Sequence, residues 1–239
     1  MKLQGKKVVV LGGSSGIGLA AAHGAISDGA AVVVVSSSKA KVAAAVAALG
    51  SKAKGEVANL GEERQVAELF GRIGAFDHLA YTAGDTLKLG ELASIDLATA
   101  RQAYELRLFG AITAVKYAAP HIRAGGSIVL TTGIAGARPR KGWSLAASVC
   151  GAMEGLTRAL AVELAPIRVN AVSPGSVRTP LWANIPEAQR EAMFREVAAR
   201  LPVGRVGEPE DLAEAYLYLM RNQFSTGQIV VADGGAVLV

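Results

Sequence analysis

Seven residues near the start of the chain have the types and the spacing of a phosphate-binding turn. The segment Gly12-Gly13-Ser14-Ser15-Gly16-Ile17-Gly18 follows an apolar run and precedes a helical pattern that extends to about Asp28. Glycines at a strand-to-helix junction let the backbone approach a pyrophosphate, and the free N–H groups of the helix N-terminus face the anion. A plain tight turn is the alternative, because a glycine cluster alone is a weak signal. The predicted phosphate contacts are Gly12, Ser14, Ser15, Gly16, Ile17 and Gly18.

The second group of chemically informative residues follows the apolar run 31–35. An acidic side chain at this place would accept hydrogen bonds from the ribose 2′-hydroxyl of a dinucleotide and would repel a 2′-phosphate. The run is instead followed by Ser36-Ser37-Ser38-Lys39, three hydroxyls and one ammonium group. These residues favour NADP(H) over NAD(H). The alternative is a polar loop followed by the N-cap of a helix.

Seven short apolar runs are expected to position these residues. Because the runs are apolar almost throughout, they indicate strands of a parallel sheet that is covered on both faces. The predicted strands are residues 7–11, 31–35, 53–58, 78–82, 127–132, 168–173 and 228–232.

Helical patterns occupy the segments between the runs. In residues 62–74, Val66, Leu69, Phe70 and Ile73 fall at i, i+3, i+4 and i+7, which places them on one face of a helix. Further helices are predicted from Asp96 to Pro120, over residues 144–165 and over residues 210–220. The alternation predicts a doubly wound α/β Rossmann fold with about seven parallel strands and helices on both faces, as one domain over residues 1–239.

Composition limits the classes of function. The single cysteine, Cys150, excludes an internal disulfide, and no cysteine and histidine cluster has metal-ligand spacing. The first residues lack a signal-peptide pattern and the apolar runs are too short to span a bilayer, so we expect a cytoplasmic protein without a membrane partner. The net charge of +5 fits a solvated surface or an anionic ligand. Nucleic acid is disfavoured, because aromatic residues do not alternate with the basic ones.

The motifs together make the chain resemble the short-chain dehydrogenase/reductase family. The resemblance covers essentially the whole chain and implies further contacts to a dinucleotide. These are adenine near Asn59 and Leu60, the cofactor near Ala83 and Gly84 after the fourth strand, and the nicotinamide near Pro174, Gly175, Val177 and Thr179. Asn59 replaces the family's aspartate. The segments that carry the resemblance are Gly-x3-Gly-x-Gly at 12–18, Tyr-Thr-Ala-Gly at 81–84, Ile-Arg-Val-Asn-Ala-Val-Ser-Pro-Gly at 167–175, residues 202–211, Thr226-Gly227 and Asp233-Gly234-Gly235.

The resemblance also implies four catalytic residues, Asn, Ser, Tyr and Lys, and this chain differs at all four. Arg107 stands at the Asn position, Gly133 at the Ser, Ala146 at the Tyr and Cys150 at the Lys. In the family, the tyrosine transfers a proton while the lysine lowers its pKa. No tyrosine of this chain is followed by a lysine four residues later, so no shift of the alignment restores the pair. Loss of a positioned general acid typically costs about 10² to 10⁴ in rate.

Other polar residues are candidates for the substrate region. We expect Arg107 to point toward the pocket, where its guanidinium could bind a carboxylate or phosphate, with Arg138 and Trp143 in the following loop. The alternative is a set of surface arginines. Thr132 is a nearby hydroxyl. Tyr81 is a conceivable surrogate acid, although buried packing is the favoured interpretation, and Cys150 is interpreted as a core residue of its helix.

Two functions of different classes follow from these observations. The first is an NADP(H)-dependent oxidoreductase with a rearranged active site and a small carbonyl or alcohol substrate, conceivably anionic. The second is a catalytically inactive sensor or scaffold that binds the dinucleotide. Small residues in 110–119 and 146–165, together with the resemblance, suggest a homodimer or homotetramer.

Overall fold

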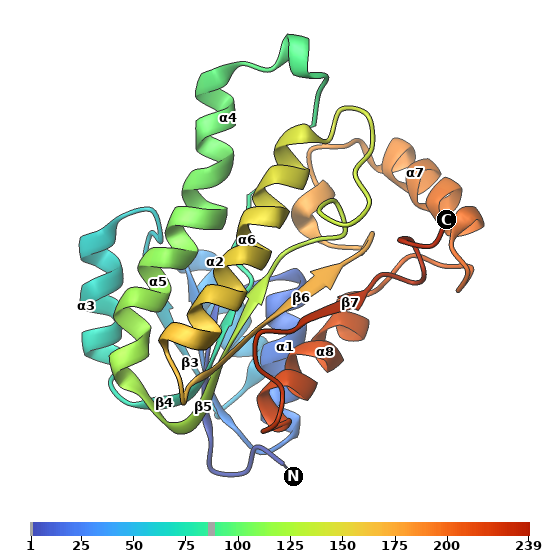
Figure 1. Cartoon of the computed structure of the whole chain (residues 1–239). Coiled ribbons are helices and arrows are strands. Elements are labelled where there is room, and N and C mark those ends of the chain that lie inside the picture. Colours follow the sequence, from blue (N-terminus) through green and yellow to red (C-terminus); the bar gives the residue numbers. More distant parts are fainter. Residues whose placement is uncertain (1, 86–88) are drawn as a thin grey trace.

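The computed structural model describes residues 2–85 and 89–239, except for the side chain of Thr99. The structure contains one sheet of seven parallel strands, as the sequence predicts (Figure 1). The order of the strands in the sheet is β3-β2-β1-β4-β5-β6-β7. The strands are β1 (Lys7–Leu11), β2 (Ala31–Ser36), β3 (Ala53–Val57), β4 (Phe76–Tyr81), β5 (Ile122–Thr131), β6 (Arg168–Pro174) and β7 (Ile229–Ala232).

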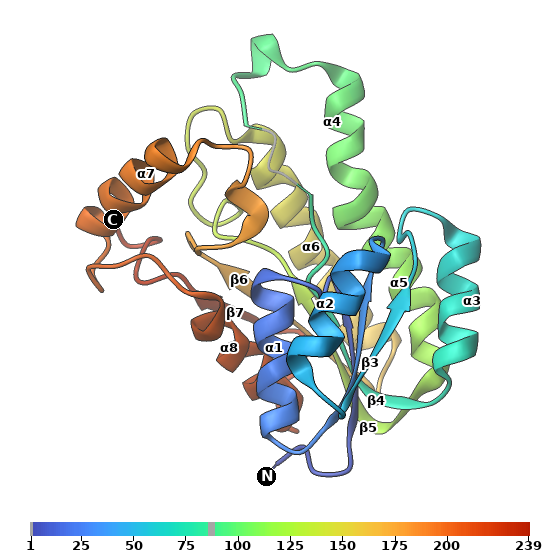
Figure 2. The same cartoon turned by 180° about the vertical axis from the view of Figure 1, so that it is seen from behind.

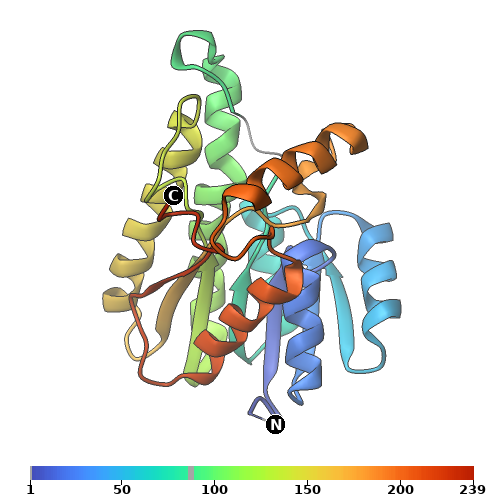
Figure 3. The ribbon, with the colours of Figure 1, turned by 90° about the vertical axis from the view of Figure 1, so that its right-hand side faces the viewer.

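Alternate side chains of the central strands enter two separate cores. Val9 and Leu11 of β1 pack with helices on one face of the sheet, and Val8 and Val10 pack with helices on the other. Figures 2 and 3 show the second face, where α8, α1 and α2 follow one another. The first face carries α3 (Glu63–Ile73), α5 (Gly110–Ala118) and α6 (Ser144–Glu163); the second carries α1 (Gly16–Ser27), α2 (Lys39–Leu49) and α8 (Pro209–Arg221).

The helix predicted between Asp96 and Pro120 is interrupted in its middle. It consists of α4 (Leu97–Tyr104), a π-helical turn η2 (Glu105–Phe109) and α5, and it ends in the 3-10 turn η3 (Ala119–His121). A π-turn widens the helix and is frequent at functional sites. Arg107 lies within this turn.

Two helices were not identified as separate elements by periodicity. One is α2, which is built mainly from alanine and valine, so its apolar residues do not form a narrow stripe. The other is α7 (Glu187–Arg200), a charged helix with Phe194 as its buried residue. The remaining short turns of the described chain are η1 (Leu92–Ser94) and η4 (Pro180–Trp182).

Helix α6 is long and apolar enough to cross a membrane by length and composition alone, although few of its residues are fully buried. Leu156, Leu160 and Ala161 of this helix pack against the first core. A helix that packs on a sheet needs such an apolar side, so this composition is weak evidence for a membrane segment.

The order of the strands determines where a ligand can bind. The chain leaves β1 and β4, which are neighbours, toward opposite sides of the sheet, which opens a crevice beyond their carboxyl ends. Gly12 directly follows β1, and Thr82 directly follows β4. The candidate site lies in this crevice.

Candidate active site

The glycine-rich turn is shaped so that side chains would obstruct it. Gly12 and Gly16 adopt left-handed backbone conformations, with φ of 84° and 51°. A Cβ atom on Gly12 would lie 2.6 Å from the Ala83 nitrogen, and one on Gly18 would lie 2.4 Å from the Gly12 oxygen. These close approaches keep the segments after β1 and β4 together.

The N-terminus of α1 points its backbone donors into the same turn. Ser15 precedes the helix, and its side chain makes no capping hydrogen bond. The first turn of α1 carries no acidic residue, so the partial positive charge of the helix end is not neutralised there. The geometry fits a pyrophosphate, as the sequence predicts.

At the adenosine end of the cavity, the lysine that lines the wall is not the one that the sequence predicts. Ser36 and Ser37 line the cavity together with Lys41, whereas Ser38 and Lys39 do not. Ser38 caps α2, because its hydroxyl accepts a hydrogen bond from the Lys41 amide at 3.4 Å. Lys39 occupies the first position of α2 and is exposed. Lys41 therefore replaces Lys39 as the candidate contact to a 2′-phosphate.

Asn59 and Leu60 line the cavity beside these residues. The Asn59 side-chain oxygen accepts a hydrogen bond from the Gly61 amide at 3.0 Å. The Asn59 amide in turn donates to Gln65 Oε1 at 2.9 Å. Asn59 thus shapes the turn before α3 in addition to facing the cavity.

The nicotinamide end contains the residues that the resemblance implies. Trp182 follows them in the chain, and its Nε1 donates to the Val177 carbonyl oxygen at 2.9 Å. Gly175 lies against Asp233, where a Cβ atom would come within 2.7 Å of the Asp233 Cα. The lining residues at this end include Ala83, Gly84, Pro174, Gly175, Val177 and Thr179.

All four positions that the resemblance implies for catalysis lie around this one cavity. Arg107, Gly133, Ala146 and Cys150 are among its lining residues. Cys150 is therefore a half-buried wall of the cavity, which corrects its interpretation as a core residue. Burial raises the pKa of its thiol, so the group is protonated at neutral pH.

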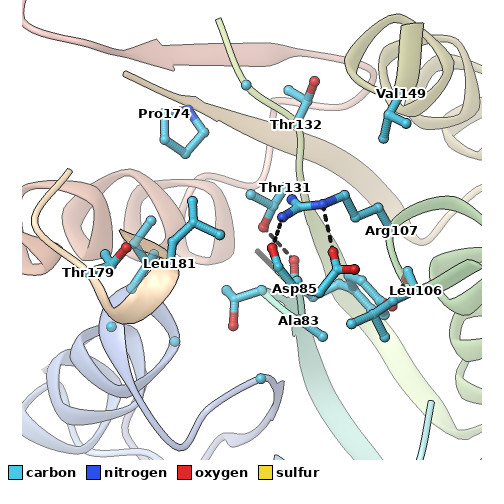
Figure 4. Close-up of a pocket in the computed structure, with 18 of the residues that line it drawn as sticks. Ala83, Asp85, Leu106, Arg107, Thr131, Thr132, Val149, Pro174, Thr179 and Leu181 are labelled. Atoms are coloured by element: carbon cyan, nitrogen blue, oxygen red, sulfur yellow. Dashed lines mark hydrogen bonds and ion pairs between the residues drawn. The ribbon is translucent and has the colours of Figure 1, made fainter. Parts of the chain in front are cut away.

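Arg107 reaches the cavity, as predicted, but its guanidinium already has an acidic partner. Its Nε lies 3.2 Å from Asp85 Oδ1, and its Nη2 donates to the Asp85 main-chain oxygen (Figure 4). The group also lies against Gly84, where a Cβ atom would be 3.1 Å from Nη1. The positive charge of Arg107 is thus partly neutralised by Asp85, and an anionic ligand stays a prediction. Asp85 carried no sequence signal, because it becomes a partner only through the fold.

Tyr81 is a packing residue, in agreement with the favoured interpretation. Its side chain is buried and its hydroxyl donates to the Leu106 carbonyl oxygen at 2.5 Å. Burial raises the pKa of this phenol. Tyr81 is thus a weaker acid than a free tyrosine.

The predicted substrate residues separate into two groups. Thr132 and Trp143 line the cavity, and the Thr132 hydroxyl donates to the Cys150 carbonyl oxygen at 3.1 Å. Arg138 does not line it: the residue borders a separate hollow with Arg140 and Arg200. Arg138 points away because the loop after β5 turns outward before α6 begins. No group of three metal-ligating side chains occurs within the described residues.

The complete cavity has a volume of about 620 Å³. Its substrate end is mainly apolar, and both tryptophans of the chain are in its wall. Residues that sequence reasoning did not identify there are Asp85, Leu89, Ala103, Leu106, Leu145, Val149, Met153, Pro180, Leu181 and Trp182.

Comparison with known proteins agrees with this geometry. The family model described as enoyl-(acyl carrier protein) reductase matches residues 12–237. The short-chain dehydrogenase/reductase fsr5 of Gibberella fujikuroi is 37% identical over 255 residues, which cover 99% of this chain and 96% of that protein.

Two solved structures share the fold over nearly their whole length. A small-chain dehydrogenase in complex with NADPH is 35% identical, with a TM-score of 0.84 over 98% of this chain and 99% of that one. The MalC reductase/Diels-Alderase of Malbranchea aurantiaca is 31% identical, with a TM-score of 0.92 over 100% of this chain and 98% of that one. The chain therefore belongs to the short-chain dehydrogenase/reductase family of oxidoreductases.

Proposed function

We propose that this protein is an NADP(H)-dependent oxidoreductase whose active site works without the family's usual proton donor. The observation that carries the proposal is the single cavity that joins the glycine cradle to the positions Arg107, Gly133, Ala146 and Cys150. A similar protein binds NADPH, which supports a nicotinamide dinucleotide.

The residues of the cavity fit such a dinucleotide from end to end. The turn around Gly12 and Gly18 would hold the pyrophosphate, because the N-terminus of α1 carries no capping or acidic side chain that competes for its amide groups. Ser36, Ser37 and Lys41 would receive a 2′-phosphate, and no carboxylate lines this end to repel it. A bound nicotinamide would supply or accept a hydride at the other end.

The chain's own groups can orient a substrate but are poorly suited to protonate it. Ala146 has no proton to give, and the Tyr81 hydroxyl is bonded to Leu106. The Thr131 hydroxyl lies within hydrogen-bonding distance of the Tyr216 hydroxyl and donates to the Tyr81 carbonyl oxygen. Placing the reactants beside each other in an apolar cavity can still sustain hydride transfer.

A catalytically inactive dinucleotide sensor or scaffold is the second candidate. It is favoured by the replacement of all four catalytic positions, whereas the intact nicotinamide end favours the oxidoreductase. Both candidates require dinucleotide binding, and only the first requires turnover.

A titration followed by a turnover screen separates the two candidates. NADPH and NADH are each titrated against the protein, with tryptophan fluorescence as the signal, because both tryptophans line the cavity. Oxidation of NADPH is then followed in the presence of carbonyl and imine compounds. We expect tighter binding of NADPH than of NADH and turnover of a subset of compounds. Binding without any turnover would favour the sensor, and failure of both dinucleotides to bind would refute both candidates.

A further inference from the structure

The substrate end of the cavity combines two indole rings with one ion pair. Trp143 and Trp182 are the two tryptophans of the chain, and both line the cavity together with Asp85 and Arg107. The Asp85 side chain is 42% exposed, so a ligand can reach it. The apolar residues that surround this pair include Leu89, Leu106, Leu145, Val149 and Leu181.

The ion pair leaves part of the carboxylate available. Asp85 Oδ1 is 3.2 Å from Arg107 Nε, and the Asp85 main-chain oxygen accepts from Arg107 Nη2. The Asp85 side chain remains 42% exposed beside this contact. Arg107 therefore holds the carboxylate from one side and leaves part of it accessible to a bound molecule (Figure 4).

Among the described residues at this end of the cavity, Tyr81 and Cys150 are poor proton donors. Burial raises the pKa of the Tyr81 phenol and also that of the Cys150 thiol. The Arg107 guanidinium is engaged with Asp85. Reduction of a ketone produces an alkoxide that needs a proton, so these groups suit a ketone poorly.

We propose, on the basis of the NADP(H)-dependent function above, that the substrate is an iminium cation in a largely apolar or aromatic molecule, held by the Asp85 carboxylate in the apolar end of the cavity. Hydride addition forms one C–H bond at the iminium carbon, and the electron pair of the C=N π bond moves to nitrogen. The substrate becomes a neutral amine, the reduced nicotinamide supplies both electrons and is oxidised, and no proton is consumed.

The half-exposed carboxylate of this end favours a cation. Carboxylates attract cations strongly when the surroundings are apolar. Arg107 offsets part of this attraction, because its Nε lies 3.2 Å from Asp85 Oδ1. The neutral amine product loses this attraction, which helps its release.

A binding experiment without cofactor tests the role of Asp85. The probe is N,N-dimethyl-tetrahydroisoquinolinium, a permanent cation that cannot be reduced, and its binding is followed by quenching of tryptophan fluorescence. We expect Asp85→Asn to weaken binding about tenfold or more, because a charge-assisted contact is lost. Glu68→Gln removes a carboxylate from an arginine pair on exposed α3 and serves as the matched control. Equal binding to the wild type and Asp85→Asn would overturn the proposal.

A turnover experiment with the wild-type protein needs no variant. N-methyl-dihydroisoquinolinium and tetralone, a neutral ketone of similar size, are compared with NADPH. We expect reduction of the cation only, at a rate that is the same in H₂O and D₂O. Faster reduction of tetralone, or cation reduction that slows severalfold in D₂O, would overturn the proposal. NADPH binding measured separately shows whether the dinucleotide function itself has failed.

Discussion

At the scale of single residues, the cavity is defined by partners that are distant in the chain. Arg107 and Asp85 are 22 residues apart and meet because the turns after β4 and within η2 face each other. The sequence predicts that Ser38 contacts the cofactor, but its hydroxyl caps α2 instead. Lys41, in the first turn of the same helix, lines the cavity. A serine or lysine in this segment can therefore either stabilise the helix or face the cavity, depending on its position relative to the first residue of the helix.

Lys41 is the residue on which NADP(H) preference is expected to depend. In Lys41→Ala, we expect the Kd for NADPH to rise about tenfold while the Kd for NADH stays unchanged, because only NADPH carries a 2′-phosphate. Lys39→Ala removes an exposed lysine two residues away and should leave both constants unchanged. Fluorescence titration measures all four constants. A larger effect of Lys39→Ala would restore the prediction from sequence.

His78 is expected to make the folding stability depend on pH. The ring is buried and lies 2.9 Å from Ser127 Oγ, and burial lowers its pKa from 6.5 to about 4. Asp77 beside it opposes this shift, while Arg168 and Lys6 reinforce it. The unfolded chain therefore takes up a proton as pH falls through 6.5, whereas the folded protein does so only near 4. The contribution of His78 to the free energy of unfolding is therefore constant above about pH 6.5. It decreases as the pH falls from 6.5 to about 4, by up to about 3 kcal/mol in total.

Urea unfolding at several pH values checks this expectation. His78→Gln retains a polar group near Ser127 but does not titrate, so its stability should fall less between pH 7 and pH 4.5 than that of the wild type. The remaining titratable groups are shared by both proteins and cancel in the difference. Parallel pH profiles would show that His78 does not contribute.

At the scale of secondary structure elements, the β1–α1 junction leaves no room for side chains at Gly12 and Gly18. Its glycines satisfy two demands at once, a left-handed backbone at Gly12 and direct contact between segments at Gly18. The helix end that results offers its amide groups to an anion without a competing side chain. Binding thus depends on the shape of a backbone turn more than on any side chain of it.

Gly18→Ala is expected to abolish dinucleotide binding. The added methyl group would lie 2.4 Å from both the Gly12 oxygen and Thr82 Oγ1, so the turn must open. Fluorescence titration with NADPH gives the binding constant, and circular dichroism shows whether the variant is folded. A folded variant with unchanged affinity would contradict this account of the turn.

Gly71→Ala is the matched control on α3. A Cβ atom there meets nothing within 4 Å, and replacing a helical glycine with alanine stabilises a helix by about 0.5–1 kcal/mol. We therefore expect unchanged binding and a slightly raised Tm.

At the scale of the whole molecule, one side of the protein is unusually apolar. Helices α5 and α6 cover the first core, yet their outer faces expose Ile112 and Val162, and Phe109 is exposed directly before α5. Val162, near the C-terminal end of α6, is 81% exposed. Such a surface, next to close-packed helices, is typical of an interface between copies of a chain.

We therefore expect a homodimer or homotetramer that Val162→Glu breaks. A buried, unpaired carboxylate at the interface would weaken association by several kcal/mol. Size-exclusion chromatography with light scattering measures the resulting change in mass. Leu92→Glu alters an apolar residue that is 77% exposed on η1 and should leave the mass unchanged. A wild-type protein of monomer mass would refute the expectation.

Much of this protein can be read directly from its sequence. The apolar runs predict the strands most directly at β1 and β2, because a strand buried on both faces needs apolar residues at nearly every position. The edge strand β3 carries Lys54 and Glu56 and is largely exposed. Gly12, Gly16 and Gly18 predict the cradle, because the demand for a residue without a side chain is local. The absence of any Tyr-x3-Lys pair is likewise a property of the sequence.

Tertiary structure alone decided how the polar residues are distributed. It paired Arg107 with Asp85, selected Lys41 instead of Lys39, placed Arg138 outside the cavity and brought Trp182 into its wall. The physical reason is that backbone conformation and burial are encoded over a few neighbouring residues. The partner of a charged side chain instead depends on which segments the sheet brings together, and on the exact turn at which each helix begins.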